Sequence, residues 1–373
     1  MALCQNRAAK AVCEGLTVTE RARKLMDTMR LAQHEGVLLH NPSNMFYVSG
    51  YTGEGLVLVT SGACVIVTDF RYTEQAESQA PGFSVEMTDK GKSHEEIVNA
   101  LCKREGIDTL YYEDDYLTVR AFDTCRETVR GVEWKPVGGA VEQLREVKDE
   151  GELGLIAEAC RLTGDAFERA LSVIREGMTE KELCAELIYR LYKFGSEGPS
   201  FDPITISGPN TSLPHGVPSE RELQYGDFVT MDFGCLYHGY CSDMTRTIAL
   251  GYVSEKMDKV YHTVLEAQLA GIAATKAGVT GKAMDAAARK VIDDAGFVGC
   301  FGHSYGHSLG LLIHEAPNAS MRNDKPMPAG AVVSAEPGIY IPDEFGVRIE
   351  DVTVITDTGC EILTKSPKNL IIL

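Results

Sequence analysis

The second half of the sequence contains an internal repeat, and this repeat limits the folds that the chain can adopt. One copy begins at Gly177 with GMTEKELCAEL, and the other begins 101 residues later at Gly278 with GVTGKAMDAAA; each predicts a helix that ends at a glycine. HGVP follows from His215 in the first copy, and HEAP follows from His314 in the second. Two apolar, acid-bearing segments complete each copy. The repeat therefore predicts one domain whose two halves share a plan.

Four acids occupy matching places in the two halves. Asp232, in YGDFVTMDFG, is the counterpart of Glu336, in AGAVVSAEPG, and a second acid lies four residues after a glycine in each copy, at Asp243 and Glu350. Apolar and β-branched residues surround these acids, which predicts that they lie in buried strands. A buried carboxylate is unfavourable unless it is paired or binds a metal ion, and close carboxylates raise one another's pKa.

If an approximate twofold axis relates the halves, the four acids converge on one centre, and bound cations are expected to neutralise them. Carboxylate oxygens are hard ligands, and four of them with one imidazole suit two divalent ions about 3.5–4 Å apart. Manganese or cobalt fits this set better than a structural zinc. Candidate imidazoles lie in GHSYGHSLGLLIHE, at His303, His307 and His314. In the alternative interpretation, the acids are partly exposed and pair with Arg246 or Arg348.

Length, composition and charge restrict the class of protein. The 373 residues are enough for two domains, and the content of 44% apolar and 24% charged residues is typical of a soluble globular protein. No run of about 20 apolar residues predicts a membrane span. The net charge of −18 repels a phosphate backbone, so a nucleic-acid partner is not expected. Small molecules or peptides are the expected partners.

The N-terminus and the cysteines bear on the compartment. The first 15 residues contain two basic residues but no continuous apolar core, so no secretory signal is predicted. The eleven cysteines are scattered and odd in number, and we expect them to be reduced and mostly buried. Cys235 and Cys241 flank the acids, but they lack a second pair and are expected to pack in the core rather than to bind zinc. We therefore expect a cytoplasmic protein.

The first part of the chain predicts a small α/β domain. A charged stretch at 144–153 separates it from a helix predicted at 154–174, so the boundary is expected close to residue 145. The chain is thus predicted to be an α+β protein with domains at 1–145 and 146–373. The elements expected in the first domain are a helix over 19–36, a strand at 37–39, a turn at 41–44, two strands within 55–70 joined at Ser61 and Gly62, a helix at 94–105, and strands within 106–115 and 132–137.

The motifs around the acids and histidines resemble those of a known enzyme family. The chain carries LPHG, MDFG, SDMTRT, GHSLGLLIHE, EPGIY and VRIED, a set similar to that of the dinuclear metallopeptidases of the pita-bread fold. That family includes Xaa-Pro dipeptidase (prolidase), aminopeptidase P and methionine aminopeptidase. The first domain, with NMFYVSGYTG and TDFRYTEQA, resembles the creatinase/prolidase type of N-terminal domain, which methionine aminopeptidases lack. The resemblance implies a proline-specific peptidase with a pseudo-twofold pita-bread catalytic domain.

The resemblance also implies a role for each candidate residue. The metal ligands would be four carboxylates and one imidazole: Asp232 on one ion through both oxygens, Asp243 and Glu350 bridging the two ions, and His307 with Glu336 on the other. The groups that face the substrate would be three histidines and one arginine: His215 and His314 in the catalytic pocket, His303 on the substrate side, and Arg348, which supports the site. No position departs from the family pattern, whereas creatinase, the metal-free relative, lacks the complete ligand set.

The implied reaction is hydrolysis of an Xaa-Pro bond by a hydroxide that bridges two metal ions. Manganese is the expected metal, with cobalt and zinc as alternatives, because two such ions lower the pKa of the bridging water. Glu336 is expected to carry a proton to the leaving nitrogen, and His215 or His314 to hydrogen-bond the oxyanion. An Xaa-Pro amide has no N–H, so its recognition requires a dedicated pocket, which Phe201 or Tyr340 could line.

Several alternatives accompany this prediction. A dipeptidase is preferred to an aminopeptidase P because the short chain and compact N-terminal domain resemble those of the smaller bacterial prolidases. A lyase or another non-peptidase enzyme can use the same metal site, since a fold does not fix a substrate. A catalytically silent binding protein is less expected because no ligand is missing. Short proline-containing peptides are the expected partners, and the resemblance implies a homodimer.

Overall fold

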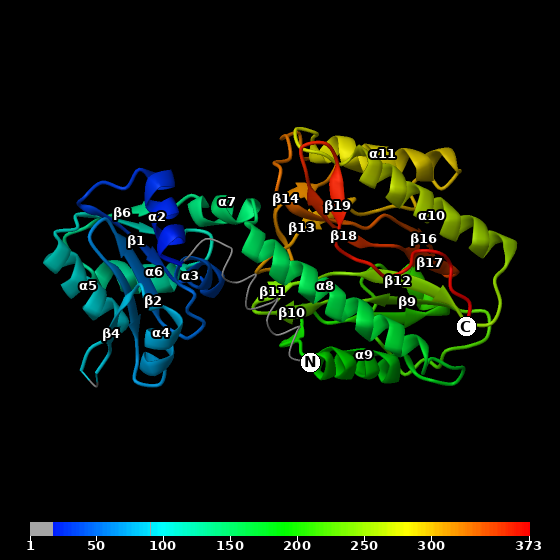
Figure 1. Ribbon diagram of the computed structural model, residues 1–373, viewed down its shortest axis with the longest axis horizontal. Helices are drawn as coiled ribbons and strands as arrows, with labels where there is room; N and C mark the ends of the chain where they lie inside the picture. The colour runs from blue at the N-terminus through cyan, green and yellow to red at the C-terminus, as the bar shows by residue number, and fades with distance from the viewer. Residues whose placement is uncertain (1–17, 90) are drawn as a thin grey trace. The chain divides into compact units, whose positions relative to one another are not determined.

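The computed structural model describes residues 18–89 and 91–373 (Figure 1). The described chain divides into two compact units, one that ends at Arg145 and one that begins at Glu146. The first 17 residues, which include Cys4, Cys13 and the segment predicted to contain no secretory signal, lie outside the described residues. Within the described ranges, no helix has both the length and the apolar content that a membrane span needs.

A six-stranded mixed sheet forms the unit that ends at Arg145. Its strands are β1 (Glu35–Leu39), β2 (Leu56–Thr60), β3 (Cys64–Thr68), β4 (Ser84–Met87), β5 (Thr109–Tyr112) and β6 (Glu133–Pro136). They lie in the order β4-β3-β2-β1-β5-β6. β2 pairs antiparallel with both β1 and β3, whereas β4, β5 and β6 each join the sheet in parallel. The hairpin predicted around Ser61 and Gly62 is confirmed by the β2–β3 pairing.

Helices alternate with the strands of this sheet along most of the unit. They are α2 (Val18–Met29), α3 (Pro42–Ser49), α4 (Thr73–Gln79), α5 (His94–Glu105), α6 (Val119–Thr128) and α7 (Ala140–Glu146). Apolar side chains of α5, such as Val98 and Leu101, share a core cluster with Leu38, Leu58 and Val65 of the sheet. α5 has the bounds that the sequence predicts, because Ser93 caps its start and Gly106 ends it in a left-handed conformation.

Two local predictions for this unit are wrong. The helix predicted over 19–36 is shorter, because Arg30 adopts a left-handed conformation (φ 52°) just after its end. The turn predicted at 41–44 is instead the start of α3. Asn41 caps this helix by accepting a hydrogen bond from the backbone N–H of Ser43, and proline occupies the first helical position. An asparagine followed by proline satisfies a helix start as well as a turn, and here the capped helix is the outcome.

Two halves with the same order of elements form the unit that begins at Glu146. Each half places a pair of packed helices before its strands, which confirms the plan predicted from the repeat. The helices are α8 (Glu150–Leu171) and α9 (Glu180–Phe194) in the first half, and α10 (Glu255–Ala274) and α11 (Gly281–Asp294) in the second. Figure 1 shows the two pairs on opposite sides of the strands. α8 begins four residues before its predicted start, because Asp149 caps it in a capping box with Glu152.

The strands of the two halves form separate small sheets. The first half contains β7 (Gly198–Pro199), β8 (Ile204–Ser207), β9 (Phe228–Asp232), β10 (Cys235–Tyr237), β11 (Tyr240–Cys241) and β12 (Thr245–Ala249). The second contains β13 (Gly306–Ser308), β14 (Glu315–Ala319), β15 (Val332–Ala335), β16 (Gly338–Ile341), β17 (Phe345–Arg348), β18 (Asp351–Ile355) and β19 (Cys360–Ile362). The sheet orders are β11-β10-β7, β12-β9-β8, β14-β13-β15-β18-β19 and β16-β17.

Each helix pair packs on the strands of its own half. In the first half, Phe167 of α8 and Leu183 of α9 share a buried cluster with Val229 of β9. In the second half, α10 and α11 contribute to a cluster that includes Val333 of β15. All nine cysteines in the described ranges are free thiols, and Cys235 packs in the first-half core. Burial of these apolar faces fixes the strands whose ends carry the acids.

A buried arginine connects the two halves close to those strand ends. The Arg246 side chain is only 2% exposed, and all five N–H donors of its guanidinium have acceptors. Its acceptors are the carbonyls of Thr245, Glu350, Ser366 and Pro367 and one carboxylate oxygen of Asp351. Lys368 and Gln268 bind the other oxygen of Asp351. Arg246 therefore pairs with Asp351 and not with any of the four acids predicted to bind metal.

The substitution Arg246→Met tests this connection. Removing one partner of a buried ion pair leaves the other charge inadequately compensated, so we expect the free energy of unfolding to fall by about 3–5 kcal/mol. Urea unfolding followed by circular dichroism measures the change. The matched control is Arg161→Met, because the Arg161 side chain is 49% exposed in its ion pairs, and there a loss below about 1 kcal/mol is expected. Equal losses in the two variants would contradict the role of Arg246.

Candidate active site

The four acids lie at the ends of paired strands. Asp232 is the last residue of β9, whereas Asp243, Glu336 and Glu350 lie just outside β12, β15 and β18. The prediction that the acids lie within strands is therefore correct only for Asp232. Because β9 pairs antiparallel with β12 and β15 with β18, the two acids of each half lie at the same end of their sheet. A position beyond the ladder leaves the carboxylates of Asp243, Glu336 and Glu350 free to face the other half.

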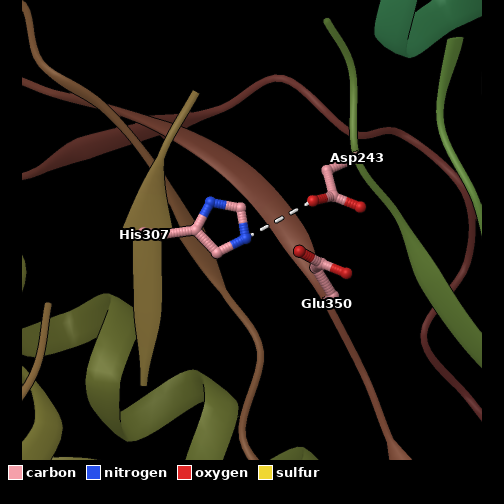
Figure 2. Close-up of side chains that lie close together, drawn as sticks. All are labelled: Asp243, His307 and Glu350. Carbon is pink, nitrogen blue, oxygen red and sulfur yellow. Dashed lines mark ion pairs between the residues drawn. The ribbon is translucent and has the colours of Figure 1, made fainter. Parts of the chain in front are cut away.

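Three side chains from both halves point toward one centre (Figure 2). Asp243, His307 and Glu350 each offer a ligand atom, and these atoms all lie within 4.8 Å of one another. His307 Nε2 lies 3.6 Å from Asp243 Oδ2 and 3.3 Å from Glu336 Oε1. One imidazole nitrogen thus faces an acid from each half.

Burial and repulsion raise the pKa values of three of the acids. Burial contributes most to the raised pKa of Asp243, and the charges of Asp232 and Glu336 add to it. The pKa of Glu350 lies well above its ordinary value, first because of burial and then because of Asp243 and the other acids. Burial raises the pKa of Glu336 to about 7, although the positive charge of Arg348 opposes the shift. Without a cation, the centre therefore retains protons near neutral pH.

Several carboxylate oxygens at the centre have no hydrogen-bond partner. Asp232 Oδ1, Asp243 Oδ1 and Glu350 Oε1 are buried and unbonded within the described part of the chain. Buried polar atoms in folded proteins are nearly always bonded, so these oxygens require a further partner. Carboxylate oxygens with an imidazole nitrogen form a donor set for divalent cations such as manganese or cobalt. The residues therefore fit the metal ions that the sequence predicts.

The hydrogen bonds of His307 leave one nitrogen available to a metal ion. Its Nδ1 lies 3.2 Å from the carbonyl oxygen of Ser308, which can only accept, so the ring proton is placed on Nδ1. Burial lowers the pKa of His307, which favours the neutral ring. Nε2 then carries a lone pair directed at the acids, and a neutral imidazole with this tautomer is the form that binds metals.

His303 is bonded through both ring nitrogens. Nδ1 donates to the carbonyl of Ser304 at 2.9 Å, so Nε2 accepts from the Tyr340 hydroxyl at 2.8 Å. That hydroxyl in turn accepts from Arg348 Nη1 at 2.8 Å. Burial lowers the pKa of His303 to about 3. This chain of hydrogen bonds places His303 beside Glu336, with its Nδ1 4.0 Å from a carboxylate oxygen of that residue.

Two exposed histidines flank the centre. The ring of His314 lies 4.3 Å from the ring of His307, and its pKa is lowered by burial and then by the nearby His307 and His215. His215 also lowers the pKa of Glu336, so its charge acts on the centre. Both His215 and His314 are exposed to solvent. The structure therefore brings all four predicted site histidines to one region, two within the centre and two at its margin.

A buried ion pair holds the segment that carries His314. Glu315 accepts a hydrogen bond from the backbone N–H of Leu312 at 2.9 Å, and Lys148 approaches its other carboxylate oxygen at 3.2 Å. The side chains of Lys148 and Glu315 are 1% and 6% exposed. A charged acceptor shielded from water strengthens these hydrogen bonds and restricts the segment next to His314.

Arg348 binds one of the acids, and four of the five N–H donors of its guanidinium have acceptors. Its Nη2 binds Asp232, and its Nε donates to Thr245 Oγ1 at 3.0 Å. Its Nη1 bonds to Tyr340 and to the carbonyl of Pro214 at 3.3 Å. The alternative in which Arg348 pairs with an acid is thus correct for Asp232, but the acid is buried rather than exposed.

Two hydroxyl residues that the sequence analysis missed orient the acids. Thr245 Oγ1 donates to Glu350 Oε2 at 2.8 Å. Ser334 Oγ donates to Glu336 Oε1 at 3.0 Å and accepts from the backbone N–H of His307 at 3.0 Å. Ser334 lies two residues before Glu336, and residues two apart in an extended chain share a face, so this spacing could have found it. Thr245 lies 105 residues before Glu350, so no local spacing in the sequence indicates that contact.

Glycines permit close contacts beside the centre. A Cβ on Gly234, two residues after Asp232, would lie 1.8 Å from the carbonyl oxygen of Ser242. A Cβ on Gly306, one residue before His307, would lie 2.0 Å from the carbonyl oxygen of Ser334. These positions therefore require glycine so that the backbones carrying the ligands can approach each other.

Two parts of the chain match known protein families. Residues 154–357 match the metallopeptidase family M24, and residues 21–147 match the creatinase/prolidase N-terminal domain. The chain belongs to metallopeptidase family M24. The M24 match contains all five residues predicted to bind metal: Asp232, Asp243, His307, Glu336 and Glu350.

Relatives of this M24 metallopeptidase align along nearly their whole length. An Xaa-Pro dipeptidase from Pyrococcus horikoshii is 36% identical over 358 residues, which cover 95% of this chain and 99% of the relative. The solved structure of an Xaa-Pro dipeptidase from Bacillus anthracis is 43% identical, with a TM-score of 0.92 and coverage of 96% and 100%. The structure of an X-Pro aminopeptidase from Thermotoga maritima is 37% identical, with a TM-score of 0.89 and coverage of 93% and 100%.

The raised pKa values predict how the metal-free M24 protein responds to pH. A carboxyl whose pKa rises on folding binds more protons in the folded state, so stability falls as pH rises from its unfolded pKa toward its folded pKa. For Glu336 this window runs from 4.5 to about 7. Each unit of raised pKa lowers the free energy of unfolding by about 1.4 kcal/mol above the window.

Asp243→Asn tests this response, because it removes one of the repelling charges. We expect the loss of stability between pH 5 and pH 8 to be smaller in this variant than in the wild type, as measured by urea unfolding after chelation of metal. Asp258→Asn is the control, because Asp258 is 58% exposed and its ion-pair partner is His262 rather than a residue of the centre. Identical pH dependence in all three proteins would show that the acids do not repel one another.

Proposed function

We propose that the chain is an Xaa-Pro dipeptidase, a prolidase, that acts by metal-dependent hydrolysis. The observation that carries this proposal is the buried centre formed by Asp232, Asp243, His307, Glu336 and Glu350, with its unbonded carboxylate oxygens. The names of the relatives from Pyrococcus horikoshii and Bacillus anthracis support the choice of substrate. The creatinase/prolidase N-terminal domain supports it as well.

The five residues would hold two divalent ions, with manganese as the preferred metal and cobalt or zinc as alternatives. The family resemblance would make Asp243 and Glu350 the shared ligands, and one atom of each lies within 4.8 Å of a His307 ring nitrogen. Asp232 and Glu336 complete the set from opposite halves. When bound, such ions lower the pKa of water and polarise the scissile carbonyl.

Glu336 is the proposed proton carrier. A carboxylate can accept a proton and release it again, as a general base that then acts as a general acid must do. The Glu336 side chain is 16% exposed, more than that of Asp243 at 6%, so solvent and substrate can reach it. Glu336 would take a proton from the attacking water and pass it to the proline nitrogen as the amide bond breaks.

The exposed histidines are the proposed contacts to the substrate. His215 and His314 flank the centre, where an N–H from either ring can donate to the oxyanion that forms at the scissile carbonyl. His303 and Arg348 are bonded to Tyr340 and to the protein backbone, so we propose that they act by holding the acids and the pocket wall. A proline nitrogen offers no N–H, which makes pocket shape decisive in recognition.

A dipeptidase must also accommodate the free carboxylate of the substrate. An aminopeptidase that releases the residue before proline from longer peptides is the second candidate, and the likeness to the Thermotoga maritima X-Pro aminopeptidase favours it.

We propose a cytoplasmic homodimer for either activity. Free thiols at every cysteine in the described ranges agree with a reducing compartment.

Hydrolysis of Ala-Pro beside Ala-Pro-Ala and Ala-Ala tests the activity. The manganese-loaded protein is expected to release alanine and proline from Ala-Pro and to leave the other two peptides largely intact, as judged by mass spectrometry. Efficient release of alanine from Ala-Pro-Ala would identify an aminopeptidase instead. If no peptide is cleaved with manganese, cobalt or zinc, the peptidase proposal fails.

Asp243→Ala and Glu350→Ala test the shared ligands. The ions contribute several kcal/mol of transition-state stabilisation, so each variant should lose at least about 100-fold in kcat/KM while its circular dichroism spectrum stays unchanged. Asp258→Ala, an exposed acid on α10, should keep full activity. Wild-type turnover in either ligand variant would refute the dinuclear assignment.

A further inference from the structure

We propose that Glu180 is a positioning residue that fixes the loop carrying His215, an inference that rests on the proposed function. Glu180 is the first residue of α9 and is completely buried. It is not one of the acids of the metal centre. A buried carboxylate is unfavourable unless its oxygens are bonded, so its partners show what it does.

Five donors bind this carboxylate, and they come from three residues. Oε1 accepts from the backbone N–H of Ser207 at 2.7 Å, from its hydroxyl at 2.9 Å and from Asn210 Nδ2 at 3.0 Å. Oε2 accepts from the backbone N–H of Ser219 at 3.0 Å and from its hydroxyl at 2.7 Å. The two oxygens thus bind opposite ends of one chain segment, the loop over 207–219.

That loop carries His215 and leaves its side chain exposed. Ser207 is the last residue of β8, so one end of the loop is fixed by a sheet, and the other end is fixed through Ser219. Joining both ends to one buried group removes much of the freedom that a loop of this length would have. The position of His215 relative to the centre therefore depends on the backbone that Glu180 holds.

Arg221 orients both serine hydroxyls toward Glu180. Its Nη1 donates to Ser207 Oγ, and its backbone N–H donates to Ser219 Oγ at 3.1 Å. A hydroxyl that accepts from one neighbour has its single proton free for another, and in both serines that proton points to the carboxylate. The arrangement requires an acceptor at both oxygens, which a carboxylate provides and an amide does not.

The middle of the loop contacts the strand that carries Arg348. The backbone N–H of Gly346, in β17, donates to Thr211 Oγ1 at 2.8 Å. Arg348 Nη1 reaches the carbonyl of Pro214, the residue before His215. Glu180 holds the ends and β17 holds the middle, so the loop is connected to the same arginine that binds Asp232.

The variant Glu180→Gln distinguishes positioning of this loop from a general contribution of Glu180 to the stability of the fold. Glutamine keeps one accepting oxygen but presents an N–H₂ group to the donors of the other serine, so one end of the loop is released. We expect amide hydrogen exchange in peptides covering 207–219 to rise about tenfold or more in the metal-free protein, because hydrogen bonds to a charged acceptor are lost. Ser219→Ala, which removes a single donor, should give a smaller rise in the same peptides.

Glu182→Gln is the matched control on the same helix. Glu182 is exposed and accepts from the backbone N–H of Thr179 in a capping box that glutamine also satisfies. Exchange in 207–219 should then remain at the wild-type rate. Unchanged exchange in Glu180→Gln, or a rise spread evenly over the whole chain, would overturn the proposal.

A double-mutant cycle connects the loop to catalysis. In the wild-type background, Glu180→Gln should lower kcat/KM for Ala-Pro by about tenfold. In the His215→Ala background the same substitution should lower it by less than about twofold, because Glu180 acts through His215. An equal fold loss in both backgrounds would assign Glu180 to the fold alone. If the wild type cleaves no Xaa-Pro substrate, the proposed function fails, while the exchange comparison still decides the role of Glu180.

Discussion

Four acids lie together in one buried centre, and the unit that begins at Glu146 must hold their carboxyl groups there: Asp232, Asp243, Glu336 and Glu350. Burial alone makes each carboxylate unfavourable, and proximity adds repulsion that raises the pKa of Asp243, Glu336 and Glu350. Among the described residues, Arg348 is the cation that pairs with this group, and it binds Asp232. One positive charge does not balance four acids, so in the metal-free protein the acids retain protons near neutral pH. The same group of side chains suits divalent ions, which membership of the M24 family implies.

The surrounding residues hold the acids without neutralising them. Thr245 and Ser334 each donate a hydroxyl proton to one carboxylate, which fixes its direction and leaves the other oxygen available. Arg246 forms an ion pair with Asp351, and its remaining N–H groups donate to backbone carbonyls, including that of Glu350. A guanidinium placed directly on Glu350 would compete with a metal ion for the same oxygens. Directing the cation to the backbone and to a neighbouring acid avoids this competition.

The sequence was sufficient to predict what is periodic or repeated. The repeat predicted two halves with acids in matching places, and the spacing of polar and apolar residues predicted α5 and the β2–β3 hairpin. The sequence was insufficient where one local pattern fits two structures. Asn41 is an example, because an asparagine can begin a turn or cap a helix. The sequence also did not predict the partners of Glu180, because a hydrogen bond to Ser219 depends on how distant segments pack rather than on local pattern.

The centre and its margin differ in how their buried acids are bonded. At the margin, the segments that carry His215 and His314 are held by Glu180 and by Glu315 with Lys148, and these buried acids have protein donors within the structure. At the centre, the acids keep oxygens that no described protein group bonds. The margin can thus be formed by the folded chain alone, whereas the centre keeps carboxylate oxygens available to added ions. It follows that loss of metal should disturb the acids first, while the loops that position the two histidines keep their protein contacts.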